Sequence, residues 1–485
     1  MLQTMDMREF DWIVIGGGSA GYAAARSGVE LGLETAVVDA SEELGGLCIL
    51  RGCMPSKTLI ESANRLRSAR RAAEFGLRVG DTRAEVPEII ARKRELIADF
   101  AGYRQGQLTD GRFELLRGRA RFVDPHTLEV QPLDGSAPYQ VRGRCFCIAT
   151  GSVIHVPPFP GLDGVPFWNS DDVLQAEQVP ERVAVFGGGA IALEMACYFE
   201  GLGREVTVIQ RSERVLTGLD ADLTKALTGA MEERGIRVLC GRQPRQVSRR
   251  GELVRIELEA SGRGGVGDEA AEESLEVGAV LVATGRKPAL DGLGLERAGV
   301  ERDGGGGVRV DASMASNVPH VFAAGDACSD LAVVHVAVDQ GETAARNAAR
   351  RLGREVSARR YDDRLKLFGI FTDPEVAAVG LGEEEARRRG LPVRAAGYPF
   401  ADHGKSMVRG ETHGFVKMVA HAETGELLGA SVVGPEATEL IHEVVVAMHF
   451  RATASDFMRI PHYHPTLAEI WTYPAEELAE ELAGA

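Results

Sequence analysis

The 485-residue chain has few aromatic residues, no long hydrophobic run and no excess of positive charge. Aromatic residues make up only 6% of the sequence while glycine occurs 58 times, which favours an α/β protein with many tight turns over a β-sandwich. No apolar run approaches the roughly 20 residues that a transmembrane helix needs. Acidic residues precede the first strand-like run where a secretion signal would be basic, so we expect a cytoplasmic protein.

The net charge and the cysteine spacing exclude several classes of partner. The 55 basic and 71 acidic residues give a formal net charge of −16, which repels phosphate backbones and anionic lipids, so we expect neither a nucleic acid nor a membrane partner. The seven cysteines contain no CxxC pair and no zinc-type spacing, so we expect no metal site. Five of them are expected to be small core residues: Cys145, Cys147, Cys197, Cys240 and Cys328.

Two segments, 11–40 and 182–212, share one pattern: an apolar strand, a Gly-rich turn, an Ala-rich helix and a second apolar strand. Each segment therefore predicts a βαβ unit of about 30 residues. Each is followed by an apolar strand that ends in Ala-Thr-Gly, at 149–151 and 283–285. A duplicated dinucleotide-binding domain explains this repeat better than chance.

The rest of the chain shows where the predicted domains meet. The Pro-rich stretch 156–166 indicates a boundary, because Pro and Gly interrupt both helices and strands. Residues 260–274 predict a solvated hairpin loop, 302–311 another turn, and 331–352 a helix. From about residue 353, alternating strands and a helix predict an α+β domain, which ends in a tail expected to face solvent.

The first Gly-rich turn has the features of a dinucleotide site. Gly16, Gly18 and Gly21 have GxGxxG spacing after a strand, and Asp39 ends the next strand 18 residues beyond Gly21. The glycines permit a tight turn and close backbone approach, and the helix N-terminus offers amide hydrogens to a pyrophosphate. The acid is placed to hydrogen-bond ribose hydroxyls. We expect a dinucleotide here rather than a purely structural turn.

The second turn differs from the first at two positions. Gly187 and Gly189 are followed by Ala192 where a third glycine would stand, and the second strand ends in Gln210 and Arg211 with no acid. An acid there would repel a 2′-phosphate, whereas Arg211, helped by the nearby Arg214, would attract one. We therefore expect NADPH, with NADH as the alternative if these arginines are merely solvated.

The segment GGLCILRGCMPSK, residues 45–57, contains two cysteines five positions apart. A regular helix would separate their Cα atoms by roughly 8–9 Å, beyond the ~7 Å limit for a disulfide. Closing Cys48 to Cys53 therefore needs a distorted segment, which Gly52 can supply. A strained small-loop disulfide is easily reduced, as a catalytic couple requires. A metal site and two unconnected cysteines are the alternatives.

In this combination of motifs the sequence resembles the class I pyridine nucleotide-disulfide oxidoreductases, the flavoprotein disulfide reductases that include dihydrolipoyl dehydrogenase, glutathione reductase and mercuric reductase. The resemblance rests on the first turn, the GGxCxxxxCxPSK box, both Ala-Thr-Gly strands, VFAAGDA at 321–327 and HPTLAE at 464–469. It implies an α/β fold with two Rossmann-like domains and a C-terminal α+β dimerisation domain. The implied ranges are an FAD-binding domain at 1–152, an NAD(P)H-binding domain at 153–281, a segment returning to the FAD domain at 282–352, and the dimerisation domain at 353–485.

The resemblance also assigns roles to the reactive groups. Cys48 would be the interchange thiol that meets substrate, and Cys53 the charge-transfer thiol against the flavin. Lys57 would approach the reactive edge of the flavin and pair with Glu194. Asp326 would hydrogen-bond the ribityl and pyrophosphate part of FAD.

A histidine is needed on chemical grounds as well, because a thiolate is the nucleophile and its proton must be removed and returned. The resemblance assigns this role to His464, oriented by Glu469 and supplied by the partner subunit of a homodimer. His464 precedes a proline in a polar stretch, which is not typical of a core histidine. We expect His462 to pack at the surface or interface.

The candidate residues form two sets. The catalytic set is Cys48, Cys53, Lys57, Glu194, His464 and Glu469. The cofactor-binding set is Gly16, Gly18, Ser19, Ala20, Gly21, Asp39, Gly46, Lys57, Ala149, Thr150, Gly151, Gly187, Gly189, Ala190, Ile191, Gln210, Arg211, Gly285, Gly325 and Asp326.

Two positions depart from the family pattern. Arg51 lies between the cysteines and would depress a thiolate pKa or attract an anionic substrate, unless it simply points into solvent. Ala190 stands where several relatives have a tyrosine over the nicotinamide pocket, so slow oxidation of reduced flavin by oxygen is expected as a side reaction.

The preferred hypothesis is an NADPH-dependent reductase of a small disulfide, in which electrons pass from FAD through Cys48 and Cys53. The first alternative is a dihydrolipoyl dehydrogenase that oxidises dihydrolipoamide with NAD⁺, as the HxHPTLAE ending indicates. A flavin-dependent quinone reductase or oxidase, and a non-catalytic redox sensor, are the further alternatives.

Overall fold

The computed structural model describes residues 7–261, 273–329 and 331–483. The chain divides into two compact units. The first consists of the described parts of 1–56, 91–155 and 286–362, and the second of those of 57–90, 156–285 and 363–485. Each unit is described by itself below.

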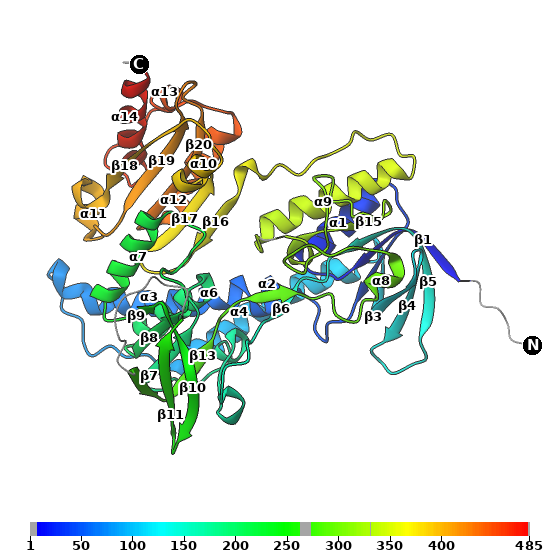
Figure 1. The fold of residues 1–485 in the computed structure, drawn as a ribbon, viewed down its shortest axis with the longest axis horizontal. Helices are drawn as coiled ribbons and strands as arrows, with labels where there is room; N and C mark the ends of the chain where they lie inside the picture. The colour runs from blue at the N-terminus through cyan, green and yellow to red at the C-terminus, as the bar shows by residue number, and fades with distance from the viewer. Residues whose placement is uncertain (1–6, 262–272, 330, 484–485) are drawn as a thin grey trace, which may run out of the picture. The chain divides into compact units, whose positions relative to one another are not determined.

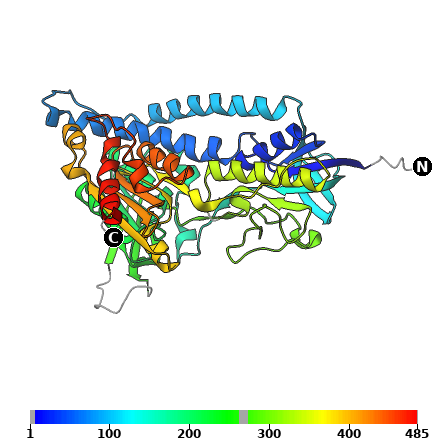
Figure 2. The same ribbon diagram turned by 90° about the horizontal axis from the view of Figure 1, so that it is seen from above.

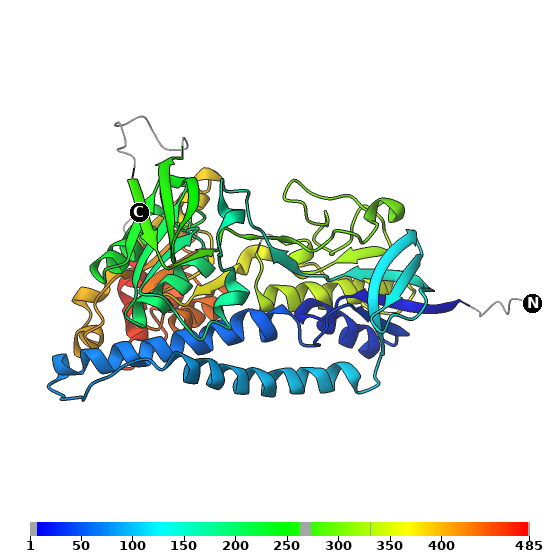
Figure 3. The ribbon, with the colours of Figure 1, turned by 90° about the horizontal axis from the view of Figure 1, so that it is seen from below.

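The first unit is built on a mixed sheet. Its strands are β1 (Arg8–Ile15), β2 (Thr35–Asp39), β3 (Glu114–Asp124), β4 (Thr127–Pro132), β5 (Tyr139–Ile148) and β15 (Val321–Ala323). Strands β2, β1, β5 and β15 run parallel, whereas β3, β4 and β5 form an antiparallel meander, drawn in cyan in Figure 3. Helices α1 (Ser19–Glu30) and α9 (Val334–Arg351) lie side by side and pack against this sheet (Figure 1).

Side chains on the central strands of this sheet alternate between two cores, as the two-residue period of a strand requires. Trp12 and Val14 pack into the core beneath α1 and α9, whereas Ile13 and Ile15 pack into the core on the other face. Cys145 and Cys147 both lie in the core beneath α1 and α9 and are fully buried. The prediction that these two cysteines are small core residues is therefore confirmed.

The second unit contains a parallel sheet and an antiparallel hairpin layer. The parallel sheet has the order β13 (Ala279–Val282), β7 (Arg182–Phe186), β8 (Glu205–Gln210), β9 (Arg237–Cys240). Helix α6 (Ala190–Gly201) follows β7, and α7 (Ala221–Glu233) precedes β9. Strands β10 (Arg242–Arg250), β11 (Leu253–Ala260) and β12 (Glu273–Val277) form the antiparallel layer.

The C-terminal part of the second unit is a five-stranded antiparallel sheet. Its order is β16 (Leu367–Ile370), β17 (Glu375–Gly380), β20 (Leu427–Gly434), β19 (Phe415–His421), β18 (Val393–Pro399). Helix α12 (Ala437–His449) packs on β17 and β20, and α14 (Thr472–Ala483), red in Figure 2, packs on β18 and β19. Leu478 of α14 is fully buried, so the expectation that the whole tail faces solvent was wrong.

The remaining elements, among them the long helices α3 and α4, connect these sheets. They are α2 (Leu47–Arg51), α3 (Cys53–Arg70), η1 (Arg71–Phe75), α4 (Val86–Thr109), β6 (Ser152–Ile154), η2 (Leu162–Gly164), α5 (Ser170–Val173), β14 (Arg286–Pro288), α8 (Leu295–Ala298), η3 (Gly325–Ala327), η4 (Asp363–Leu365), α10 (Glu383–Arg388), η5 (Phe400–Asp402), α11 (Gly404–Arg409), α13 (Ala454–Phe457) and η6 (Ala468–Trp471). In the first unit, β6 pairs with β14 in a small antiparallel ribbon.

The predicted fold class, α/β with two Rossmann-like βαβ units and a C-terminal α+β part, is confirmed by these sheets. The predicted helix at 331–352 corresponds to α9, and the turn at 302–311 is closed by an antiparallel bridge between Arg302 and Val308. Most of the loop predicted at 260–274 lies outside the described residues. Within the described chain, no helix is both long and apolar enough to cross a bilayer. The four predicted domain ranges stay predictions.

Lys417 on β19 is a buried cation that joins several elements of the second unit. Its side chain is only 8% exposed, and Nζ lies 2.6 Å from Glu383, 2.8 Å from Asp222 and 3.2 Å from Asp220. Asp220 also accepts hydrogen bonds from the first amides of α10, while Glu384 accepts one from the first amide of α7. Burial disfavours the ammonium, but the bonds to Asp222 and Glu383 outweigh this and raise the pKa of Lys417.

Replacing Lys417 with methionine should therefore destabilise the second unit. The change leaves three carboxylates close together without their cation, and removing one partner of a buried ion pair costs about 3 kcal/mol or more. Lys287→Met is the matched control, because its pair with Asp291 is more than half exposed on both sides. Urea unfolding should show a lower midpoint for Lys417→Met alone, and equal midpoints in the two variants would contradict this interpretation.

Candidate active site

Close backbone contacts define the first Gly-rich turn in the first unit. Gly16 has φ +105°, and a Cβ on it would lie 2.3 Å from the carbonyl oxygen of Ala149. A Cβ on Gly21 would lie 1.7 Å from the carbonyl oxygen of Gly16, so both positions require glycine. Around Gly18, by contrast, the nearest atom to an added Cβ is the Cα of Gly46, 3.9 Å away. The turn is thus closely packed against backbone atoms at Gly16 and Gly21, whereas there is open space at Gly18.

The first turn of α1 provides backbone amides for an anion. Gly18 is its N-cap without a side-chain cap, and no acidic residue occupies the first turn, where Ser19 and Ala20 lie. Asp39 is buried, and its two carboxylate oxygens accept hydrogen bonds from the amides of Gly17 (2.7 Å) and Ser41 (2.8 Å). Asp39 therefore ties the end of β2 to the turn, and its contact with a ribose stays a prediction.

Polar groups of the same unit lie at the ends of β5 and β15. The hydroxyl of Thr150, in the first Ala-Thr-Gly, is buried and has no hydrogen-bond partner among the described residues. Ser152 donates a 2.6 Å hydrogen bond to Asp326, and the amide of Gly325 donates to Gln340. A buried hydroxyl without a partner, next to an uncapped helix N-terminus and an open Gly18, fits a bound dinucleotide such as FAD.

The redox box has a one-residue break between its cysteines. Helix α2 ends at Arg51 and α3 begins at Cys53, so Gly52 interrupts what would otherwise be a continuous helix. A Cβ on Gly52 would lie 3.0 Å from the Cα of Cys48, which shows how closely the backbone folds back here. Cys48 is half-buried and Cys53 is exposed. The structure therefore contains the distortion that pairing of these thiols requires, while the disulfide itself stays a prediction.

The other cysteines are poor nucleophiles. Burial raises the pKa of the Cys145 and Cys197 thiols to about 11 and that of Cys328 to about 12, and it also raises the pKa of the fully buried Cys147. Burial also raises the pKa of the half-buried Cys240. Such thiols stay protonated at neutral pH, which leaves Cys48 and Cys53 as the candidates for thiol chemistry.

The second Gly-rich turn, in the second unit, repeats the contact of the first. Gly187 has φ +121°, and a Cβ on it would lie 2.4 Å from the carbonyl oxygen of Ala283. Gly189 caps α6 without a side-chain hydrogen bond, followed by Ala190 and by Ile191, which is 37% exposed. Ala192 is fully buried in the core, so this turn accommodates a Cβ where the first turn does not.

Strand β8 ends in Gln210 and is followed by Arg211, so no acid stands at the strand end itself. Gln210 is the last strand residue and lies against Gly188, and Arg211 beyond it is exposed. Arg214 pairs with Glu384 at 3.2 Å, so its charge is partly satisfied within the protein. Arg211 is therefore better placed than Arg214 to bind a phosphate at this strand end.

Lys57 and Glu194 form an ion pair, as expected from the resemblance. Nζ of Lys57 lies 2.9 and 2.8 Å from the two carboxylate oxygens, and Glu194 is only 4% exposed. The sequence analysis missed Phe371, whose amide donates a 3.0 Å hydrogen bond to Glu194 and whose ring centroid lies 4.7 Å from Nζ of Lys57. A buried charge pair is stabilised by such extra donors and by the ring face.

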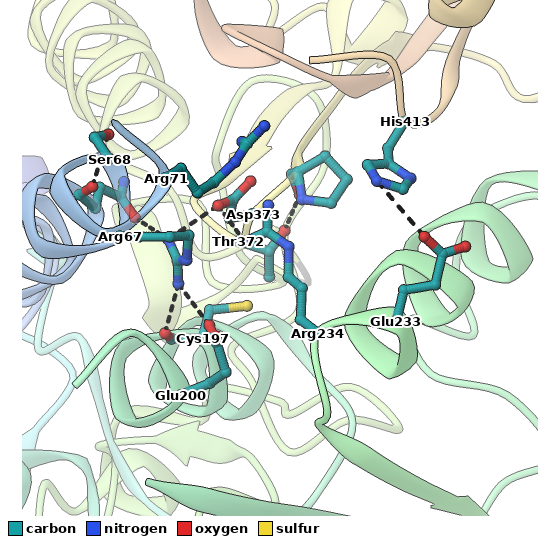
Figure 4. Close-up of polar contacts among 12 residues, drawn as sticks. Arg67, Ser68, Arg71, Cys197, Glu200, Glu233, Arg234, Thr372, Asp373 and His413 are labelled. Carbon is teal, nitrogen blue, oxygen red and sulfur yellow. Dashed lines mark hydrogen bonds and ion pairs between the residues drawn. The ribbon is translucent and has the colours of Figure 1, made fainter. Parts of the chain in front are cut away.

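The loop that carries Phe371 is anchored two residues further on by Asp373 (Figure 4). Asp373 forms ion pairs with Arg67 of α3 (2.9 Å) and with Arg234 after α7. Arg67 also donates to the carbonyl of Cys197 (3.1 Å) and pairs with Glu200 (2.8 Å), both on α6. Helices α3 and α6 and the connection between α7 and β9 thereby hold the loop next to Glu194.

His464 and Glu469 also lie together in the second unit. Nδ1 of His464 is 2.9 and 3.1 Å from the two carboxylate oxygens of Glu469, and the His464 side chain is 79% exposed. His462 is 7% exposed and pairs with Glu443 at 2.5 Å, so it is a packed polar group. The sequence analysis also missed His403, which is fully buried with Nε2 3.4 Å from Glu469.

Comparison with known proteins covers nearly the whole chain. A family model described as "Pyridine nucleotide-disulphide oxidoreductase" matches residues 10–341, and the model of the dimerisation domain of the same group matches 368–475. The chain is 37% identical over 480 residues to a dihydrolipoyl dehydrogenase of Thermus scotoductus, covering 98% of both chains. It is 32% identical over 463 residues to a mercuric reductase of Bacillus cereus, covering 95% of this chain and 70% of the relative.

Solved structures give the same result. LpdA of Mycobacterium tuberculosis has a TM-score of 0.84 at 28% identity, covering 96% of this chain and 99% of the other. A Cu(II) complex of the HOCl-induced flavoprotein disulfide reductase RclA of Escherichia coli has a TM-score of 0.82 at 25% identity, covering 97% and 100%. The fold is thus shared along the entire length of both relatives.

Substitutions in the first Gly-rich turn should separate folding from flavin binding. Gly21→Ala places a methyl group against backbone and should lower both the thermal midpoint and the bound FAD. Gly18→Ala has room in the protein and should leave the fold intact, yet it should reduce FAD retention at least tenfold, or by about 1.4 kcal/mol, because the methyl group fills the open space. The ratio of flavin to protein absorbance measures retention, and a fully yellow Gly18→Ala protein would contradict this placement.

Proposed function

Because the chain belongs to the pyridine nucleotide-disulphide oxidoreductase family, we propose that it passes a hydride from NADPH through FAD to Cys48 and Cys53 and then reduces a small disulfide. The protein is an FAD-dependent enzyme that acts on sulfur groups with a pyridine nucleotide as the second redox partner. The identity of the disulfide, the direction of the reaction and the residue roles given below belong to the proposal.

The break at Gly52 carries this proposal. Five residues of regular helix would hold the two thiols too far apart to join. Because Gly52 separates α2 from α3, the segment between Cys48 and Cys53 departs from regular helix geometry. A disulfide closed over so short a loop is strained and easily reduced, which suits a two-electron store. The half-buried Cys48 and the exposed Cys53 are both accessible enough for exchange.

The first unit provides the residues that would hold the flavin. Bound FAD would supply two-electron chemistry between a nicotinamide and a disulfide. The amides at Gly18 would bind its pyrophosphate, and Asp326, fixed by Ser152, would orient its ribityl chain. Thr150 has a buried hydroxyl that needs a partner, which a ligand would provide.

Lys57 would supply a fixed positive charge at the reactive edge of the flavin. Glu194 and Phe371 hold its ammonium in one place, so the charge needs no reorganisation during the reaction. Cys53 precedes Lys57 by four residues on α3, which puts both on the same face of that helix. We assign Cys53 as the charge-transfer thiol and Cys48 as the thiol that attacks substrate.

His464 would move the protons. Glu469 accepts the hydrogen of Nδ1, which directs Nε2 away from the carboxylate and towards solvent. This imidazole would protonate the thiolate that leaves the substrate and stabilise the thiolate that remains. We propose a homodimer in which His464 acts on the Cys48 of the partner. The match to the dimerisation domain and the exposed side chains of Val446, Phe450 and Tyr463 support it.

The nucleotide preference depends on the end of β8. No acid stands at the end of the strand, where Gln210 lies, and the exposed Arg211 is available to a 2′-phosphate. The second candidate function is a dihydrolipoyl dehydrogenase using NAD⁺. It is favoured by the 37% identity to the Thermus scotoductus relative of that name over 98% of both chains.

Replacing Cys48 with serine tests the thiol route. The variant should keep bound FAD and its reduction by NADPH, and its NADPH-to-quinone activity should stay within about twofold of the parent. Disulfide turnover should fall by at least a thousandfold because the attacking thiolate is lost, a barrier increase of about 4 kcal/mol. Cys240→Ser is the matched control. Unchanged disulfide turnover in Cys48→Ser would favour a quinone reductase or oxidase. If the parent protein shows no long-wavelength absorbance band after two-electron reduction, a non-catalytic redox sensor is favoured.

Steady-state rates with the four cofactor and substrate combinations separate the two candidate functions. NADPH should exceed NADH in kcat/KM by at least tenfold, or ~1.4 kcal/mol, in assays with glutathione disulfide and lipoamide. Arg211→Gln should remove most of this preference while leaving the NADH rate unchanged. Arg214→Gln is the control, since Arg214 is already paired with Glu384. A tenfold preference for NADH would show that the Arg211 argument is wrong and would favour the dihydrolipoyl dehydrogenase alternative.

A further inference from the structure

His403 is a fully buried histidine behind the predicted acid/base pair, and no motif in the sequence points to it. It caps α11, directly after the turn η5 (Phe400–Asp402). Its Nε2 lies 3.4 Å from Oε1 of Glu469 and has no hydrogen bond of regular geometry. Its Nδ1 lies 2.9 Å from the hydroxyl oxygen of Ser406, which is also fully buried. A chain of polar groups therefore runs from Ser406 through His403 and Glu469 to His464.

The two contacts of the ring select one tautomer. If Nδ1 carried the proton, Nε2 would direct a lone pair at the carboxylate of Glu469. The favourable arrangement has Ser406 donating its hydroxyl hydrogen to Nδ1 and the Nε2 hydrogen facing Glu469. Burial lowers the pKa of His403 despite the nearby carboxylate, so this ring is a neutral donor at neutral pH.

Glu469 is thereby held between a buried and an exposed imidazole. Its backbone amide donates to the hydroxyl of Thr466, and its carbonyl accepts from Thr472. Ile470 and Trp471 of the same short helix are fully buried and fix its backbone. Among the described residues, His403 is the one that approaches the Glu469 side chain from the protein interior, while His464 meets it on the exposed side.

We propose that His403 is a positioning residue for His464: it holds the Glu469 carboxylate from the buried side, so that Glu469 in turn orients His464 on the exposed side. The Nε2 hydrogen of His403 faces Oε1 of Glu469, which helps to hold the carboxylate in the orientation that meets Nδ1 of His464. The inference rests on the proposed function, because it requires that His464 exchange protons with the thiols. The groups facing His403 are Glu469, His464 and the ring of Tyr473, whose centroid is 6.4 Å away.

Two routes of reduction test the inference in the FAD-loaded full-length protein. NADPH delivers electrons from the flavin side and needs no base at His464. Dithiothreitol delivers them from the substrate side: its thiolate attacks the Cys48–Cys53 disulfide, and it leaves as its cyclic disulfide. Two electrons reach the cysteines, and the two protons end on Cys48 and His464 while Cys53 stays a thiolate. Stopped-flow absorbance of the long-wavelength charge-transfer band reports both routes.

His403→Leu should slow reduction by dithiothreitol about tenfold at neutral pH, because a misplaced base loses part of its contribution. Reduction by NADPH should be unchanged. The defect should shrink above about pH 9, where dithiothreitol ionises without help. His403→Gln, which keeps an N–H donor for Glu469, should recover most of the rate. Ser406→Ala is a smaller change that removes the hydrogen bond to Nδ1 of His403, and it should cause a weaker defect of the same kind. It provides the test if His403→Leu does not fold.

Two further variants complete the test. Phe400→Leu changes a fully buried residue of the same turn without touching the polar chain, so it should leave the two routes equally fast or slow both. His464→Ala should show the full defect of the dithiothreitol route. If His464→Ala slows the dithiothreitol route and neither His403→Leu nor Ser406→Ala does, the inference about His403 is overturned while the proposed role of His464 stands. If His464→Ala shows no defect, the proposed role of His464 fails and the inference fails with it.

Discussion

The close backbone contact between a Gly-rich turn and the end of a neighbouring strand underlies both proposed nucleotide sites. In the first unit Gly16 approaches the carbonyl of Ala149, and in the second unit Gly187 approaches that of Ala283. In each case only about 2.3–2.4 Å would separate an added Cβ from that oxygen, so no other residue fits. In both units the carbonyl belongs to the alanine of an Ala-Thr-Gly segment. The contact brings the strand end and the uncapped helix N-terminus together, so that one ligand can meet both.

Two carboxylates of the candidate site, Glu194 and Glu469, are held by polar contacts from loops outside the helices that carry them. Glu194 receives a hydrogen bond from Phe371, whose loop is anchored by Asp373. Glu469 is approached from the interior by His403. In both cases a carboxylate that orients a basic group is itself oriented by a residue distant in sequence. Preorganisation of this kind is what electrostatic catalysis requires, because groups already in place need no reorganisation in the transition state.

Ion pairs between elements also hold the second unit together. Lys417 joins β19 to the beginnings of α7 and α10, and Asp373 joins the loop before β17 to α3 and α7. Each network is mostly buried and contains more than two charges, so losing one member leaves the others uncompensated. The loop that carries Phe371, and with it the hydrogen bond to Glu194, therefore depends on charges outside the recognised motifs.

The sequence alone determined the α/β class, the two βαβ units, the break in the redox box and the partners Lys57–Glu194 and His464–Glu469. These features follow from local periodicity, from glycine spacing and from motifs that the family resemblance interprets. Only the tertiary structure decided that Phe371, Asp373 and His403 support those pairs, that Asp39 is engaged by backbone amides, and that Arg214 is paired with Glu384. The physical reason is that hydrogen bonds and ion pairs depend on distances between side chains, and distances between distant segments have no local pattern in the sequence.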